Sequence, residues 1–121
     1  MIRGQIYRRS KFKIDTSDSG KADRTFNGRV YASKMECEYA RDLDLRERTK
    51  NIHSWEPQYR VPLVVGGIKI CTMVIDFRVI HNDGTTEYVE VKGFETTDYK
   101  LKKKLLEALF PGIRYTVIKK R

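Results

Sequence analysis

The chain has 121 residues, with 25 lysine and arginine residues against 16 aspartate and glutamate residues, and a formal charge of +9. Its hydrophobic content of 40% and charged content of 34% are typical of one folded domain and exclude a disordered tail. Apolar runs of only a few residues exclude a membrane-spanning helix. Two cysteines without CxxC spacing or nearby histidines, Cys37 and Cys71, argue against a zinc site or a disulfide framework, so we expect a reducing, cytosolic setting.

The basic excess lies at the two ends of the chain. Residues 1–35 carry nine basic and three acidic side chains, and residues 98–121 carry eight and two. Residues 36–97 instead carry eight basic and eleven acidic side chains. Two basic ends are typical of a protein that binds a polyanion such as nucleic acid, with a charge that only maintains solubility as the alternative.

The N-terminal third of the chain predicts an arm followed by a hairpin. Residues 1–24 show scattered basic residues and no hydrophobic period, so we expect a flexible basic arm ahead of a folded domain over residues 25–121. The dipeptide Asn27–Gly28 lies between apolar residues and predicts a tight β-hairpin.

A helix is predicted next. Ser33 followed three residues later by Glu36 is a capping-box pattern, and it predicts a helix that runs to about Arg48. At helical spacing Glu36 falls on the apolar face, whereas Glu38 points away from it.

The remainder predicts a mixed β-sheet. Alternating patterns predict strands at 55–65, 68–80 and 85–92, joined by Gly66–Gly67 and by a turn at 81–84 into an antiparallel meander. Thr97 or Asp98 is expected to cap a helix that ends at Phe110, and residues 114–119 form a last strand. The fold class is therefore α+β, with an antiparallel meander in a mixed sheet flanked by helices.

Two carboxylates are predicted to face each other on neighbouring strands. If Asn82, Asp83 and Gly84 form a three-residue loop with Gly84 left-handed, the register places Asp76 opposite Glu90. Like charges so placed are destabilising unless a cation lies between them. Two carboxylates with a backbone carbonyl and waters suit Mg²⁺, or Mn²⁺ in its place. Lys92 shares the face of Glu90 and can orient or deprotonate a water.

Asp76 followed by Glu90-Val91-Lys92, after a helix that carries Glu36, resembles the PD-(D/E)xK nuclease superfamily, which includes restriction endonucleases and Holliday-junction resolvases. The likeness to small phage-encoded nucleases of this type extends over roughly residues 26–118, although Ile75 replaces the proline that usually precedes the aspartate. It implies a restriction-endonuclease-like fold and, for a phage protein, the cytosol of a bacterial host.

The resemblance also assigns roles to single residues. Asp76 and Glu90 would be catalytic metal ligands together with the backbone carbonyl of Val91, and Lys92 the catalytic lysine. Glu36 would be the acid on the helix, a metal ligand directly or through water, or else only the capping residue of that helix. Accessory contacts are expected from Gln58, Thr96 and Tyr99. The expected DNA-binding residues are Lys100, Lys102, Lys103, Lys104, Arg8, Arg9 and Lys11.

The sequence thus predicts a Mg²⁺-dependent DNA endonuclease. Branched DNA, especially the four-way junction, is the expected substrate because so small a domain recognises shape and charge more readily than sequence. Two symmetrical nicks would then require a homodimer. The alternatives are a nonspecific or end-directed phage deoxyribonuclease and a non-catalytic nucleic-acid-binding protein.

Overall fold

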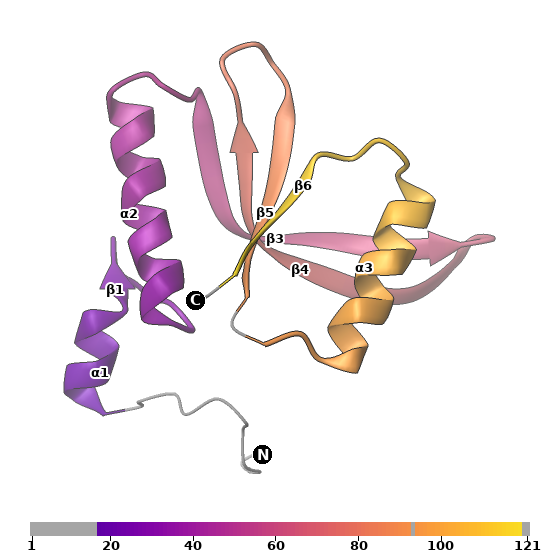
Figure 1. Cartoon of the computed structure of the whole chain (residues 1–121), viewed down its shortest axis with the longest axis horizontal. Helices are drawn as coiled ribbons and strands as arrows, with labels where there is room; N and C mark the ends of the chain where they lie inside the picture. The colour runs from indigo at the N-terminus through magenta and orange to yellow at the C-terminus, as the bar shows by residue number, and fades with distance from the viewer. Residues whose placement is uncertain (1–16, 93, 120–121) are drawn as a thin grey trace. The chain divides into compact units, whose positions relative to one another are not determined.

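The computed structural model describes residues 17–92 and 94–119 (Figure 1). The chain divides into two compact units, Met1–Tyr39 and Ala40–Arg121. Within the described ranges, no helix combines the length and the apolar character needed to cross a lipid bilayer.

The first unit contains a short helix and a small hairpin. Helix α1 spans Asp18–Asp23, and the Ser17 hydroxyl caps it by accepting a hydrogen bond from the Gly20 N–H (3.2 Å). Strands β1 (Thr25–Phe26) and β2 (Arg29–Val30) pair around the predicted turn. Positive φ angles of 52° at Asn27 and 77° at Gly28 explain why this dipeptide closes the hairpin.

Helix α1 corrects one expectation. The flexible arm was expected to extend to residue 24, but residues 18–23 are helical. Six residues are too few for a hydrophobic period, so this helix depends on its cap rather than on a pattern that the sequence displays. The rest of the expected arm, residues 1–16, lies outside the described residues.

Helix α2 (Lys34–Arg48) begins in the first unit and ends in the second. The Ser33 hydroxyl accepts a hydrogen bond from the Glu36 N–H (3.0 Å), which confirms the predicted cap. The predicted orientation is also confirmed, because Glu36 is only 4% exposed whereas Glu38 is exposed. Salt bridges at i, i+4 spacing follow the outer side of the helix, between Asp42 and Arg46 (2.7 Å) and between Asp44 and Arg48 (3.1 Å).

The second unit contains the predicted mixed sheet. Its strands are β3 (Ser54–Val65), β4 (Ile68–Ile80), β5 (Thr86–Lys92) and β6 (Tyr115–Lys119), in the order β3-β4-β5-β6. The first three strands are antiparallel, and β6 runs parallel to β5. The α+β class and the antiparallel meander are confirmed.

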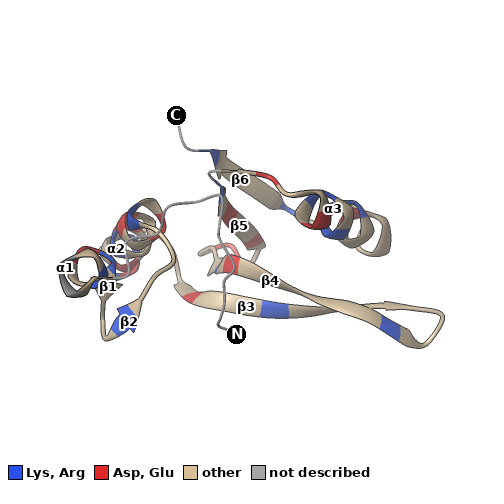
Figure 2. Cartoon of the chain, turned by 90° about the horizontal axis from the view of Figure 1, so that it is seen from below, with Lys and Arg blue, Asp and Glu red and all other residues tan. Residues whose placement is uncertain are grey.

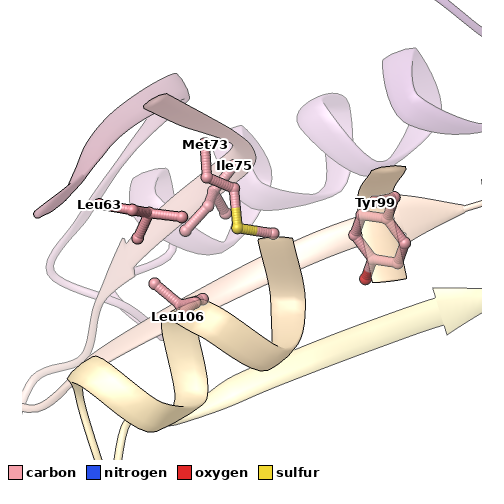
Figure 3. Close-up of a cluster of buried hydrophobic side chains, with 5 residues drawn as sticks. All are labelled: Leu63, Met73, Ile75, Tyr99 and Leu106. Carbon is pink, nitrogen blue, oxygen red and sulfur yellow. The ribbon is translucent and has the colours of Figure 1, made fainter. Parts of the chain in front are cut away.

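Helix α3 (Thr97–Leu109) connects β5 to β6 and covers one face of the β3–β4 hairpin. Figure 3 shows the buried cluster, in which Leu63, Met73 and Ile75 of the sheet face Leu106 of the helix. The N-cap is Thr96 rather than the expected Thr97 or Asp98, because the Thr96 hydroxyl accepts a hydrogen bond from the Tyr99 N–H (3.0 Å).

Candidate active site

Turn chemistry sets the register between β4 and β5. Gly84 has a φ of 90°, and the His81 N–H donates to the Thr85 carbonyl across the loop (2.8 Å). Backbone pairing then runs from Ile80↔Thr86 to Phe77↔Val89. The next positions along the two strands are Asp76 and Glu90, which therefore lie opposite each other as predicted.

At Asp76 and Glu90, hydrogen bonds to side chains replace the backbone pairing between β4 and β5. The backbone N–H of Asp76 donates to Oε1 of Glu90 (2.9 Å), and the backbone N–H of Val91 donates to Oδ2 of Asp76 (2.8 Å). Each carboxylate is thus held by the backbone of the opposite strand. This crosswise pattern fixes both side chains on one face of the sheet at the point where β4 and β5 separate.

Burial makes this carboxylate pair electrostatically unfavourable. Glu90 is 1% exposed, and Asp76 is half-buried. Burial and the nearby charge of Asp76 raise the pKa of Glu90 to about 8, against the opposing charge of Lys92. Burial also raises the pKa of Asp76, although the hydrogen bond from Val91 opposes the shift. A positive charge between the two groups would relieve this cost.

Lys92 is the positive charge that the chain itself supplies. It lies two residues beyond Glu90 on β5, on the same face, and its charge lowers the pKa of both carboxyl groups. Its ammonium lies 4.3 Å from the centroid of the Tyr99 ring. Within the described ranges, an aromatic face rather than a salt bridge holds this lysine.

Tyr115 on β6 belongs to this group, although the sequence analysis did not select it. It pairs with Tyr88 of β5 in the parallel register, which places it on the face of Glu90 and Lys92. Its hydroxyl lies 2.9 Å from the Tyr99 hydroxyl. Burial and the charge of Glu90 raise the pKa of Tyr115 well above its usual range. The alternation of Tyr115, Val117 and Lys119 was the available signal, but the register between distant parallel strands is not encoded locally.

Gln58, an expected accessory residue, lies on β3 directly opposite Asp76 of β4. The flanking pairs are Pro57↔Phe77 and Tyr59↔Ile75, and Gln58 has a φ of 54° between them. A non-glycine residue at positive φ within a strand is uncommon, and such residues concentrate at functional sites. The structure therefore brings the backbone of Gln58 to the candidate site.

The lysines of α3 fall into two groups. Lys100 and Lys104 are exposed. Lys102 pairs with Asp98 (3.5 Å), and Lys103 lies 5.8 Å from the centroid of the Tyr115 ring. Figure 2 accordingly shows both basic and acidic positions on α3.

Other predicted residues have different placements. The Thr96 hydroxyl serves as the cap of α3. Glu36 belongs to the first unit, and its role in a metal site stays a prediction, as does that of the Val91 carbonyl. The expected DNA contacts Arg8, Arg9 and Lys11 lie outside the described residues.

A second missed feature lies beside Asp76 on β4. Arg78 forms a salt bridge with Glu56, and its guanidinium carbon lies 4.5 Å from the centroid of the Tyr59 ring. It borders a pocket of about 200 Å³, whose lining residues are Ser54, Trp55, Glu56, Arg78 and Ile80. Arg78 thus places a cation two residues from Asp76 on β4, in addition to Lys92 on β5, and neither periodicity nor motif spacing indicated it.

The donor set fits a hard divalent cation with a hydrated shell. In the part of the chain that the structure describes, no three His, Cys, Asp or Glu side chains gather into a group that could hold a metal ion. Mg²⁺ typically keeps several waters and needs only one or two protein carboxylates. Asp76 and Glu90 supply two, in a position where their mutual repulsion favours a cation.

The fold and the site define an α+β domain with a buried carboxylate pair between neighbouring strands. The chain belongs to the family described as "protein of unknown function (DUF1064)", whose model matches residues 19–121. No match was found among curated proteins or among solved structures.

Proposed function

We propose that this protein is a metal-dependent DNA endonuclease with a restriction-endonuclease-like core of the PD-(D/E)xK type. The observation that carries the proposal is the crosswise hydrogen bonding of Asp76 and Glu90, with Lys92 on the same face. A structural role alone does not account for two carboxylates held together in a buried position, because their repulsion costs stability.

Asp76 and Glu90 would hold Mg²⁺ or Mn²⁺, with the Val91 carbonyl and water as further ligands. When bound, such an ion supplies a water of lowered pKa and neutralises charge on the phosphate. Backbone donors fix one oxygen of each carboxylate, Oδ2 of Asp76 and Oε1 of Glu90. The second oxygen of each side chain accepts neither of these two backbone bonds.

Lys92 contributes a charge next to the carboxylates. Its ammonium rests over the Tyr99 ring, so it is held in place without a bond to either carboxylate. From this position it would orient a water or stabilise the negative charge that develops on the phosphate. The exposed lysines Lys100 and Lys104 on the next helix would contact neighbouring phosphates.

The substrate we propose is branched DNA, with the four-way junction as its main form and a homodimer as the active species. The support is the small size of the domain and the net charge of +9. Such a domain recognises DNA through phosphates and shape rather than through bases.

The decisive experiment is a cleavage assay with fluorescent four-way junction, flap and linear duplex, each with Mg²⁺ and with EDTA. We expect Mg²⁺-dependent nicking, fastest on the junction, and loss of product with Asp76→Asn and Lys92→Ala while DNA binding persists. Glu107→Gln and Lys69→Ala, at exposed positions, are the matched controls and should keep activity.

Each alternative has its own outcome in this assay. Equal cleavage of all three substrates would indicate a nonspecific or end-directed nuclease. Binding without product at any Mg²⁺ concentration would indicate a non-catalytic nucleic-acid-binding protein.

A further inference from the structure

Two tyrosines connect helix α3 to strand β6 beside the carboxylate pair. Tyr99 is 7% exposed and Tyr115 is half-buried, and their hydroxyl oxygens are 2.9 Å apart. Tyr99 also belongs to the apolar cluster beneath α3, as Figure 3 shows. Packing therefore limits the freedom of its ring.

Each tyrosine also lies beside a different member of the candidate site. The Tyr99 ring supports the Lys92 ammonium at 4.3 Å. Tyr115 pairs with Tyr88 and so lies on the face of Glu90, and burial together with the charge of Glu90 raises the pKa of the Tyr115 hydroxyl. The two tyrosines, joined by their hydroxyls, thus lie between Glu90 and Lys92 on one face of the site.

The chemistry of the groups gives this arrangement a direction. A tyrosine hydroxyl has one proton to donate, and an ionised carboxylate can only accept. In this arrangement the Tyr115 hydroxyl would donate to an ionised Glu90 while it accepts from the Tyr99 hydroxyl. The Asp76 N–H already holds Oε1 of Glu90, and the Tyr115 hydroxyl would be a second donor to the same carboxylate.

We propose that Tyr115 and Tyr99 are positioning residues, Tyr115 for the metal-binding carboxylate of Glu90 and Tyr99 for the ammonium of Lys92. This inference rests on the proposed nuclease function and deepens it. Hydrogen-bond partners that orient metal ligands typically change metal affinity 10- to 100-fold. Tyr115 would therefore set metal affinity through its hydroxyl, and Tyr99 would set the placement of Lys92 through its ring.

Tyr115→Phe tests the first role, because it removes the hydroxyl and keeps the ring. We expect calorimetry without DNA to show Mn²⁺ binding about 10-fold weaker, and cleavage to need about 10-fold more Mg²⁺ for half-maximal rate. Tyr88→Phe, on the same face of β5, is the matched control and should change neither value. Equal Mn²⁺ affinity for wild type, Tyr115→Phe and Tyr88→Phe would overturn the proposal.

Tyr99→Phe and Tyr99→Leu test the second role. Phenylalanine keeps the aromatic face under Lys92, and leucine removes it. At saturating Mg²⁺ we expect the cleavage rate of Tyr99→Leu to fall about 10-fold below that of Tyr99→Phe, with both variants shown to be folded by thermal unfolding. Equal rates for these two variants would show that the ring does not position Lys92.

Failure of the nuclease proposal gives a different result. A wild-type protein that cleaves no DNA would refute the nuclease function, yet Mn²⁺ calorimetry would still compare wild type with Tyr115→Phe. A 10-fold difference there would support the role of Tyr115 toward Glu90 as a ligand. No difference would overturn it.

Discussion

The two parts of strand β4 differ in what surrounds them and in what they do for the molecule. Met73 and Ile75 pack against Leu106 under helix α3, in a cluster of buried apolar side chains. From Phe77 onward the strand lies between β3 and β5. Asp76 lies between these parts, where hydrogen bonds to side chains replace the backbone pairing with β5. The contrast teaches that the apolar part stabilises the sheet, whereas the polar boundary reduces its stability and holds the carboxylates of the proposed metal site.

Asp76→Asn, at the polar boundary, should have the largest effect, because it should reduce cleavage and raise stability at the same time. Asparagine can still accept the Val91 N–H, but it removes a negative charge whose burial is unfavourable. Cleavage should fall by about 10³-fold or more, while the free energy of unfolding in metal-free buffer should rise by about 1 kcal/mol. Denaturant unfolding with and without Mg²⁺ measures the second effect, and Mg²⁺ should stabilise only the wild type. A variant less stable than the wild type without metal would contradict the stated cost of the pair.

Leu106→Ala should have the next largest effect, and on stability alone. Leu106 is fully buried in the cluster, so its truncation should lower the free energy of unfolding by about 2–5 kcal/mol. Leu101→Ala is the matched control on the same helix, because Leu101 is 67% exposed and should cost less than about 0.5 kcal/mol. Chemical denaturation compares the two, and equal losses would argue against the cluster as the main source of stability.

Thr96→Ala should have a moderate effect, because it removes the cap that fixes the start of α3 near Tyr99. The loss of the hydrogen bond to the Tyr99 N–H should lower stability by about 1 kcal/mol. Thr96→Ser keeps the hydroxyl and should restore most of it. If thermal unfolding shows the serine variant to be as unstable as the alanine variant, the hydroxyl is not the stabilising group.

Glu87 should contribute the smallest effect, visible only at acidic pH. Burial acts against its ionised form, but hydrogen bonds from Thr116 (2.6 Å) and His81 (2.8 Å) and the charge of Arg114 outweigh it and lower the pKa of Glu87 below its ordinary 4.5. The native state then binds fewer protons than the unfolded chain, so this stabilisation is present above pH 4.5 and is lost as the pH falls below it.

Glu87→Gln should therefore reduce the drop in melting temperature between pH 6 and pH 3. Glu107→Gln, at an exposed position on α3, is the control and should keep the wild-type drop. A drop as large in Glu87→Gln as in the wild type would assign acid sensitivity to other groups.

The features that could be predicted from the sequence depend on local turn and cap residues. Ser33 begins α2 as expected, and Gly84 sets the register that places Asp76 opposite Glu90. These features depend on a few neighbouring residues, whose conformational preferences are strong.

Long-range contacts could not be predicted in the same way. The contact between Tyr99 and Tyr115 depends on the parallel register of β6, which tertiary packing decides. The left-handed conformation of Gln58 opposes its own local preference, so only the surrounding structure imposes it. Helix α1 gave too short a signal for its period to be recognised.

The prolines of β3 have a consequence for self-association. This twelve-residue strand forms one edge of the sheet, and long edges attract further strands from other molecules. Pro57 and Pro62 lack the backbone donor that such pairing needs, and the exposed Arg60 between them adds a charge. The outer edge of β3 is therefore a poor template for aggregation, even though the strand is long.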